Sequence, residues 1–216
     1  LFGVLKALIV VKGGLHPFIV TLGLQYALNG FILICTSGMP ITGFDESFKI
    51  FGQGRAFGVV YWTIVVALVI GAAFHVILTY TKYGRTIYAV GGNEETARLA
   101  GINVRRTRFL INVYVSVFAA LCGVFMASRF NSAQTAAGSG TELTIMASVI
   151  IGGTGMGGGA GSILGTFFGV LLLSVINNGL VLMHVSSYWQ NFIFGTILVL
   201  SLFIDKYRRS RGGGNG

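Results

Sequence analysis

The sequence predicts an all-α polytopic membrane protein, and three observations carry that prediction. Hydrophobic residues make up 54% of the 216 residues and charged residues only 10%, against about a quarter in soluble domains. The mean hydropathy is +0.80. Several apolar runs are long enough to cross a bilayer, and they are continuous rather than alternating, which favours helices over a β-barrel. A soluble globular enzyme is therefore excluded.

Six apolar segments are candidates for crossing the membrane, although one of them is short. In chain order the longer runs are Pro17–Ser37, Phe57–Tyr80, Phe109–Ser128, Ser162–Met183 and the somewhat shorter Trp189–Ile204. The sixth, Leu143–Gly153, would make only about 16 Å of helix, against a hydrocarbon core of about 30 Å. The chain begins at Leu1 rather than Met, and Leu1–Val11 resembles the second half of an apolar segment. We therefore expect an N-terminally truncated fragment, with residues 1–216 forming a single transmembrane domain.

The basic residues predict how these segments are oriented. Of the fifteen Lys and Arg residues, twelve lie before Pro17, within 82–108 or after Ile204, and the positive-inside rule makes these regions cytoplasmic. The net charge of +9 therefore reflects topology rather than nucleic-acid binding. Because the 82–108 loop and the 205–216 tail are both expected inside, an even number of crossings must separate them. Leu143–Gly153 must then cross as a broken helix, completed by the glycine-rich stretch after it, and discontinuous helices mark substrate sites in transporters.

A glycine-rich run follows the short segment and reads G-G-T-G-M-G-G-G-A-G from Gly152 to Gly161. It contains a literal G-x-G-x-x-G, but a dinucleotide site needs an acid about 20 residues later within a βαβ unit. The next acid is Asp205, and no Lys follows the glycines as in a phosphate-binding loop. We therefore expect a tight turn between two closely packed helices. The glycines assigned to this turn are Gly152, Gly153, Gly155, Gly158 and Gly161, and the spacing of Gly161, Gly165 and Gly169 adds a small face for helix packing.

The 82–108 loop contains a predicted two-turn helix, Glu94–Ala100. Asn93 is a good N-cap, the two glutamates that open the helix face its positive end, and Gly101 suits the position after the C-cap. A helix this short needs packing to be stable. From the residues alone, it is either part of a solvated connector or a fixed knob that transmits force to a cytoplasmic subunit.

Several polar residues lie in or near the predicted spans and are candidates for a translocation path. Glu142 stands where the broken helix begins; it could act in function, with Arg129 as its ion-pair partner, or be a helix N-terminal acid stabilised by the dipole. The neutral candidates suit an uncharged, hydroxyl-rich ligand, although they could equally cap helices or bond between helices. They are Asn131, Gln134, Thr135, Asn177 and Asn178. Neither the two cysteines nor the three histidines have metal-site spacing, so we expect no metal and no cofactor.

Five stretches together resemble the ribose/arabinose/xylose-type permeases of bacterial ABC importers. They are P-F-I-V-T-L-G (17–23), Y-G-R-T-I-Y-A-V-G-G-N-E-E-T-A-R-L-A-G-I-N-V (83–104), S-A-Q-T-A-A-G-S-G-T-E-L (132–143), V-I-I-G-G-T-G-M-G-G-G-A-G-S-I-L-G-T (149–166) and N-N-G-L (177–180). The chain departs from the family at Thr144, where members commonly carry an acid. The family's N-terminal membrane segments are also missing.

The resemblance implies a non-enzymatic permease subunit of the bacterial inner membrane, with a cytoplasmic C-terminus, that forms the path for a sugar, which we expect to be a monosaccharide. It implies as partners a periplasmic sugar-binding protein, cytoplasmic ATP-binding subunits and a second permease copy or a related permease. It also places the matching part of the loop against the ATPase. Those positions are Gly92, Asn93, Glu94, Glu95, Ala97, Arg98 and Gly101. The alternative is an ion-coupled secondary carrier or channel, which would need charged residues deep inside the spans.

Overall fold

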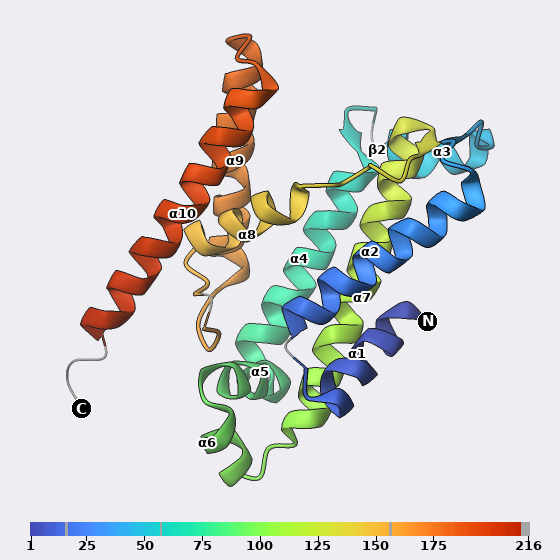
Figure 1. The fold of residues 1–216 in the computed structure, drawn as a ribbon. Coiled ribbons are helices and arrows are strands. Elements are labelled where there is room, and N and C mark those ends of the chain that lie inside the picture. Colours follow the sequence, from blue (N-terminus) through green and yellow to red (C-terminus); the bar gives the residue numbers. More distant parts are fainter. Residues whose placement is uncertain (16, 57, 156, 213–216) are drawn as a thin grey trace. The chain divides into compact units, whose positions relative to one another are not determined.

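The computed structural model describes residues 1–15, 17–56, 58–155 and 157–212, and it is helical over most of that length (Figure 1). The chain divides into two compact units. Unit 1 contains Leu1–Ala72 and Gly101–Ala137, and unit 2 contains Ala73–Ala100 and Gly138–Gly216. The single transmembrane domain expected from the sequence stays a prediction.

Within the described residues, four helices are long and apolar enough to cross a membrane. They are α2 (Pro17–Thr36), α4 (Trp62–Tyr80), α7 (Val104–Phe130) and α9 (Ile163–Leu182). Twenty helical residues extend about 30 Å, which matches the hydrocarbon core. The two remaining predicted segments are shorter apolar helices, α8 (Thr141–Ile151) and the Ser187–Phe203 part of α10 (Ser187–Gly212). The all-α polytopic fold is confirmed, whereas the crossing of α8 stays a prediction.

One predicted boundary is wrong because a hairpin interrupts the apolar pattern. The run Phe57–Tyr80 predicts one span, but its helix begins only at Trp62. Before it, β2 (Arg55–Ala56) and β3 (Val60–Tyr61) form an antiparallel hairpin with a glycine of positive φ in its turn. Phe57 itself lies outside the described residues. At the other end of the chain, the predicted segment Trp189–Ile204 corresponds to the apolar part of α10, which continues as a helix to Gly212. Residues 213–216 of the predicted tail are not among those described.

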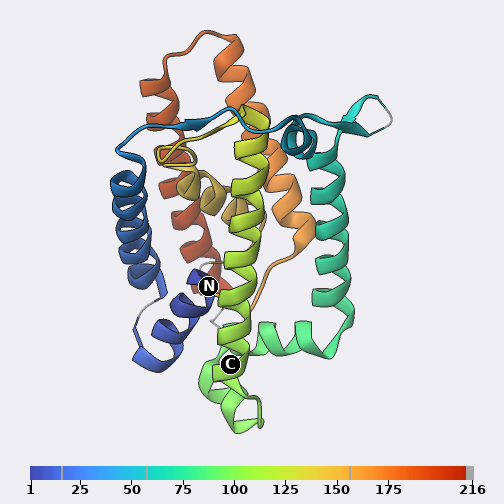
Figure 2. The same cartoon turned by 90° about the vertical axis from the view of Figure 1, so that its right-hand side faces the viewer.

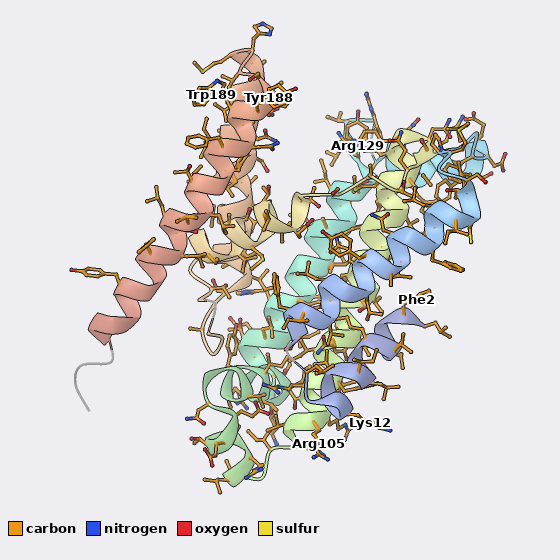
Figure 3. All side chains as sticks on the ribbon, viewed as in Figure 1. Phe2, Lys12, Arg105, Arg129, Tyr188 and Trp189 are labelled. Atoms are coloured by element: carbon orange, nitrogen blue, oxygen red, sulfur yellow. The ribbon has the colours of Figure 1, made fainter. Side chains whose placement is uncertain are left out.

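Unit 1 is built on the packing of α1 (Phe2–Gly13) along α7. Ala7 and Val10 are buried, and a Cβ on Gly3 would overlap the side chain of Ser116, so small residues let the two helices approach closely. Figure 3 shows Lys12 and Arg105 at one end of this unit and Arg129 at the opposite end. This separation of basic residues suits the predicted orientation.

The opposite end of unit 1 carries a short helix, α3 (Glu46–Gln53), held against α7 by one buried hydroxyl. Ser128 is 0% exposed, and its Oγ donates to the carbonyl of Phe48 at 2.6 Å and accepts from the amide of Gly52 at 2.7 Å. The hydroxyl of α7 therefore hydrogen-bonds two backbone groups of α3 and helps to hold α3 in place. Two short strands pair antiparallel at the same end of the unit, namely β1 (Ile41–Thr42) and β4 (Ser132–Ala133).

Unit 2 is built on α8, which packs against both α9 and α10. Ala147 and Ser148 of α8 are buried, as is Leu173 of α9. Small residues on α8 therefore let two neighbouring helices come close to it. At the start of α10, Tyr188 and Trp189 are exposed (Figure 3), as expected for aromatic side chains anchored at a membrane interface.

The 82–108 region is more helical than the sequence predicts. Figure 2 shows α4 turning sharply into α5 (Lys82–Gly92), and α6 (Glu94–Leu99) follows. Thr81 caps the new helix, because its Oγ1 accepts from the amide of Gly84 at 3.2 Å. The three arginines expected in the loop after α6 belong instead to the first turns of α7. The region is thus largely a pair of short helices rather than an open connector.

Candidate functional site

The predicted two-turn helix is present as α6, and both of its ends are built as the sequence indicates. The Oδ1 of Asn93 accepts from the amide of Thr96 at 3.0 Å, which satisfies one of the free N–H groups of the first turn. Gly101 has φ +79, in the left-handed region that favours glycine. The helix ends one residue earlier than predicted, because Ala100 serves as its C-cap.

This element presents most of its side chains to the outside. Ala97 is the one side chain of α6 that is buried, at 3% exposure, whereas Arg98 is exposed and Leu99 is 81% exposed. The helix thus exposes both charged side chains and one large apolar side chain on a fixed, capped element. The structure gathers all seven predicted coupling positions in or beside it. Gly92 ends α5, Asn93 joins the two helices, Glu94, Glu95, Ala97 and Arg98 lie in α6, and Gly101 follows it.

The glycine-rich run forms a turn after α8, as predicted. The amide of Gly152, the C-cap of α8, still makes a helical bond to the carbonyl of Ser148 at 2.9 Å, and the helix ends where Gly153 takes a positive φ. Within the turn, the amide of Gly158 donates to the carbonyl of Gly155 at 3.1 Å, and Met156 between them lies outside the described residues. Gly153 and Gly158 have φ of +89 and +78. Since residues 147–151 are helical rather than a strand, the G-x-G-x-x-G here lacks the βαβ context of a dinucleotide site.

The glycines around this turn also bring α8 and α9 into close contact. A Cβ on Gly165 would overlap the carbonyl of Gly152, and one on Gly169 would overlap the carbonyl of Ser148. The two helix backbones are therefore in direct contact at these positions, which a larger residue would prevent. The predicted small face is confirmed at Gly165 and Gly169. Gly161, the third residue of the pattern, instead lies against the side chain of Thr154 within the turn.

The neutral path candidates of unit 1 lie where α7 ends. Asn131 is the C-cap of α7, with φ +50, and its Oδ1 is buried with no hydrogen-bond partner in the part of the chain that the structure describes. Gln134 donates weakly to the hydroxyl of Ser132 at 3.4 Å, and Thr135 is half-buried. A buried amide oxygen without a partner is costly, so Asn131 is a position where a further polar group would be stabilised.

The remaining path candidates belong to unit 2. Glu142 lies in the first turn of α8, where the helix dipole stabilises a carboxylate. Asn177 and Asn178 are exposed on the apolar helix α9. Exposed amides in a membrane helix favour contact with another polar surface rather than with lipid. Convergence of the six candidates on one path, and the pairing of Glu142 with Arg129 of unit 1, stay predictions.

The sequence analysis did not identify Tyr88 and Gly91, which contact the glycine-rich turn, or Ser128, which holds α3. The hydroxyl of Tyr88 in α5 donates to the carbonyl of Gly161 at 2.9 Å, and Gly91 of α5 lies against Gly159 of the turn. The Gly91–Gly92 pair was a possible signal, because two glycines at the end of a helix allow close backbone approach as well as flexibility. The sequence signal for the role of Ser128 was a hydroxyl at the end of an apolar span.

The fold defines a polytopic membrane protein with a capped, exposed helix, α6, and a short apolar helix, α8, that a glycine-rich turn separates from α9. Residues 1–202 match the family described as branched-chain amino acid transport system / permease component, and the chain belongs to that family.

Several curated relatives are import permeases. The chain is 39% identical to the ribose import permease protein RbsC of Escherichia coli (strain K12), over 96% of the chain and 65% of the relative. It is also 39% identical to RbsC of Bacillus subtilis (strain 168), over 93% and 63%, respectively. The galactose/methyl galactoside import permease protein MglC of E. coli (strain K12) is 34% identical, over 97% and 64%. The chain thus spans less than two thirds of the length of these relatives, and no solved structure matches it significantly.

Proposed function

We propose that the chain belongs to the membrane-spanning permease subunit of an ATP-binding-cassette importer in the bacterial inner membrane. The observation that carries this proposal is the similarity to ribose and galactose import permeases along more than nine tenths of the chain. The permease would form the path for a monosaccharide delivered by a periplasmic binding protein. A second permease copy or a related permease and cytoplasmic ATP-binding subunits would complete the transporter.

The chemistry of the path candidates favours a sugar over a free amino acid, although the family description names branched-chain amino acids. A free amino acid carries an ammonium and a carboxylate, each of which needs a charged or dipolar partner when it leaves water. Five of the six candidates are neutral amides or hydroxyls, which match the hydroxyl groups of a sugar. Glu142 is the one charged candidate, and the dipole of α8 already stabilises it.

We assign to α6 the contact with the ATP-binding subunit. Its exposed Leu99 and charged side chains form a compact surface, and its capped ends hold a fixed shape that could transmit a displacement. The hydrolysis of ATP would take place in the partner, so that the permease itself would not be an enzyme. The C-terminus and α6 would both face the cytoplasm.

Nothing in the long spans favours the ion-coupled alternative. The sequences of α2, α4 and α9 contain no Asp, Glu, Lys or Arg, and the charged residues of α7 lie near its two ends. An ion-coupled carrier generally relies on charged groups inside the membrane.

Reconstitution tests this proposal directly. The complete protein is co-purified with its bound subunits, which are then identified, and is placed in proteoliposomes. Uptake of ribose, galactose and leucine is measured with and without ATP and with and without a proton or sodium gradient. ATP-dependent uptake of a monosaccharide, with an ATPase among the bound subunits, supports the proposal. Uptake driven by an ion gradient without ATP, or uptake of leucine alone, would overturn it.

A further inference from the structure

Two pairs of glycines meet inside unit 2. Gly91 and Gly92 end α5, and Gly158 and Gly159 lie in the turn between α8 and α9. A Cβ built on Gly91 would lie 2.7 Å from the amide nitrogen of Gly159, and one on Gly158 would lie 2.7 Å from the carbonyl oxygen of Gly91. The two segments therefore touch backbone to backbone, and we call these four residues the glycine clasp.

The conformation of the clasp also requires glycine on the side of the turn. Gly158 and Gly159 have φ of +78 and +77, which side-chain-bearing residues rarely adopt. A Cβ on Gly159 would in addition collide with the Cα of Gly92. Gly91, in contrast, is an ordinary helical residue, so only the contact across the clasp excludes a side chain there.

A hydrogen bond reinforces the clasp from the same helix. The hydroxyl of Tyr88 donates to the carbonyl of Gly161 at 2.9 Å. Tyr88 and Gly91 are three residues apart and lie on the same face of α5. One face of α5 thus holds both the beginning and the end of the segment from Gly158 to Gly161.

The clasp links the end of α5, beside α6, to the turn that joins α8 to α9. Gly92 is followed directly by Asn93, which caps α6, and the segment held on the other side connects α8 to α9. Side chains can absorb a small displacement by changing rotamers, whereas two backbones in direct contact cannot. A shift of α5 must therefore move the turn with it.

We propose that the glycine clasp is a positioning device that makes the coupling helix α6 and the discontinuous segment at α8 move together. The inference rests on the proposed function, because it assumes that α6 contacts the ATP-binding subunit and that α8 borders the path. It goes beyond that function by identifying Tyr88, Gly91 and Gly159 as the residues through which a displacement of α6 reaches α8.

Two substitutions separate this role from a general effect on folding. Gly91→Ala introduces the smallest side chain that cannot fit the clasp, yet alanine favours helix more than glycine does, so α5 itself should not weaken. Tyr88→Phe keeps the ring and removes only the hydroxyl that bonds Gly161. The matched control is Gly71→Ala in α4, another helical glycine, because a Cβ there meets nothing within 4 Å.

The first measurement concerns the clasp itself and needs no partner. Spin labels on cysteines replacing Ala89 and Ala160, both exposed, report the distance between α5 and the turn in a protein lacking Cys35 and Cys122. We expect a narrow distance distribution that Gly91→Ala broadens and Gly71→Ala leaves unchanged. An unchanged distribution in Gly91→Ala would overturn the clasp, whether or not the protein is an importer.

The second measurement concerns coupling in the reconstituted transporter. Sugar taken up per ATP hydrolysed should fall by about fivefold or more in Gly91→Ala, the lower end of typical coupling between sites, and by about threefold in Tyr88→Phe. Binding of the ATPase and the hydrolysis rate without substrate should stay at control levels. Normal uptake per ATP in both variants, with the label distances already broadened, would show that the clasp does not couple the two elements. A wild-type complex that neither hydrolyses ATP nor imports would instead refute the proposed function, and the label distances would still decide whether the clasp holds.

Discussion

Replacing Ser128 by alanine should release α3 from the end of α7 while leaving the rest of unit 1 folded. The hydroxyl is fully buried and joins two backbone groups of α3, the carbonyl of Phe48 at 2.6 Å and the amide of Gly52 at 2.7 Å. Alanine removes both hydrogen bonds between α7 and α3, each worth about 1 kcal/mol net. We take about 2 kcal/mol for the pair, which raises the equilibrium constant for local opening of α3 roughly thirtyfold.

Hydrogen exchange followed by mass spectrometry measures this opening segment by segment. In Ser128→Ala, amides within Glu46–Gln53 should exchange about thirtyfold faster, whereas those in the middle of α7 should be unaffected. Ser116→Ala on the same helix is the control. The Ser116 hydroxyl donates to the carbonyl of Asn112 in its own helix at 2.9 Å, so its removal strands no group of another segment. Equal exchange of α3 in both variants would show that α3 is held by other contacts and would refute this reasoning.

Three further predictions concern orientation, the coupling helix and the contact between α8 and α9. Single cysteines at positions 45 and 187 should react with an impermeant reagent in intact cells, whereas those at 94 and 209 should be protected, all in a background lacking Cys35 and Cys122. Reaction of position 94 from outside would show that the predicted orientation is wrong. Gly101→Val should distort the end of α6, because a valine in the left-handed conformation costs about 1–2 kcal/mol, and should lower substrate-stimulated ATP hydrolysis without changing membrane insertion. Unchanged hydrolysis would show that α6 only connects α5 to α7. Gly165→Leu should separate α8 from α9 and lower the melting temperature of the purified protein, because its Cβ alone would already overlap the Gly152 carbonyl. Gly179→Leu, where a Cβ meets nothing within 4 Å, should not lower it, and similar melting of the two variants would contradict the close backbone contact.

The sequence by itself determined the features that depend on short stretches of chain. Apolar length located the four long helices and the two shorter apolar ones, because each helix satisfies its own backbone and has to match the bilayer. The ends of α6 were equally local: an asparagine that bonds an amide three residues on and a glycine of positive φ need no distant partner. The glycine spacing predicted close helix packing, and the family resemblance predicted the class of transporter.

Only the tertiary structure decided which segments those features bring together. The hairpin at residues 55–61 depends on pairing between strands, so the apolar pattern alone merged its second strand with the helix that follows. Ser128 could be recognised as the attachment of α3 only once a segment some 80 residues away lay against it. The glycine clasp joins residues nearly 70 positions apart. Contacts of this kind depend on two backbones approaching from distant parts of the chain, and no local propensity or spacing in either segment records the identity of its partner.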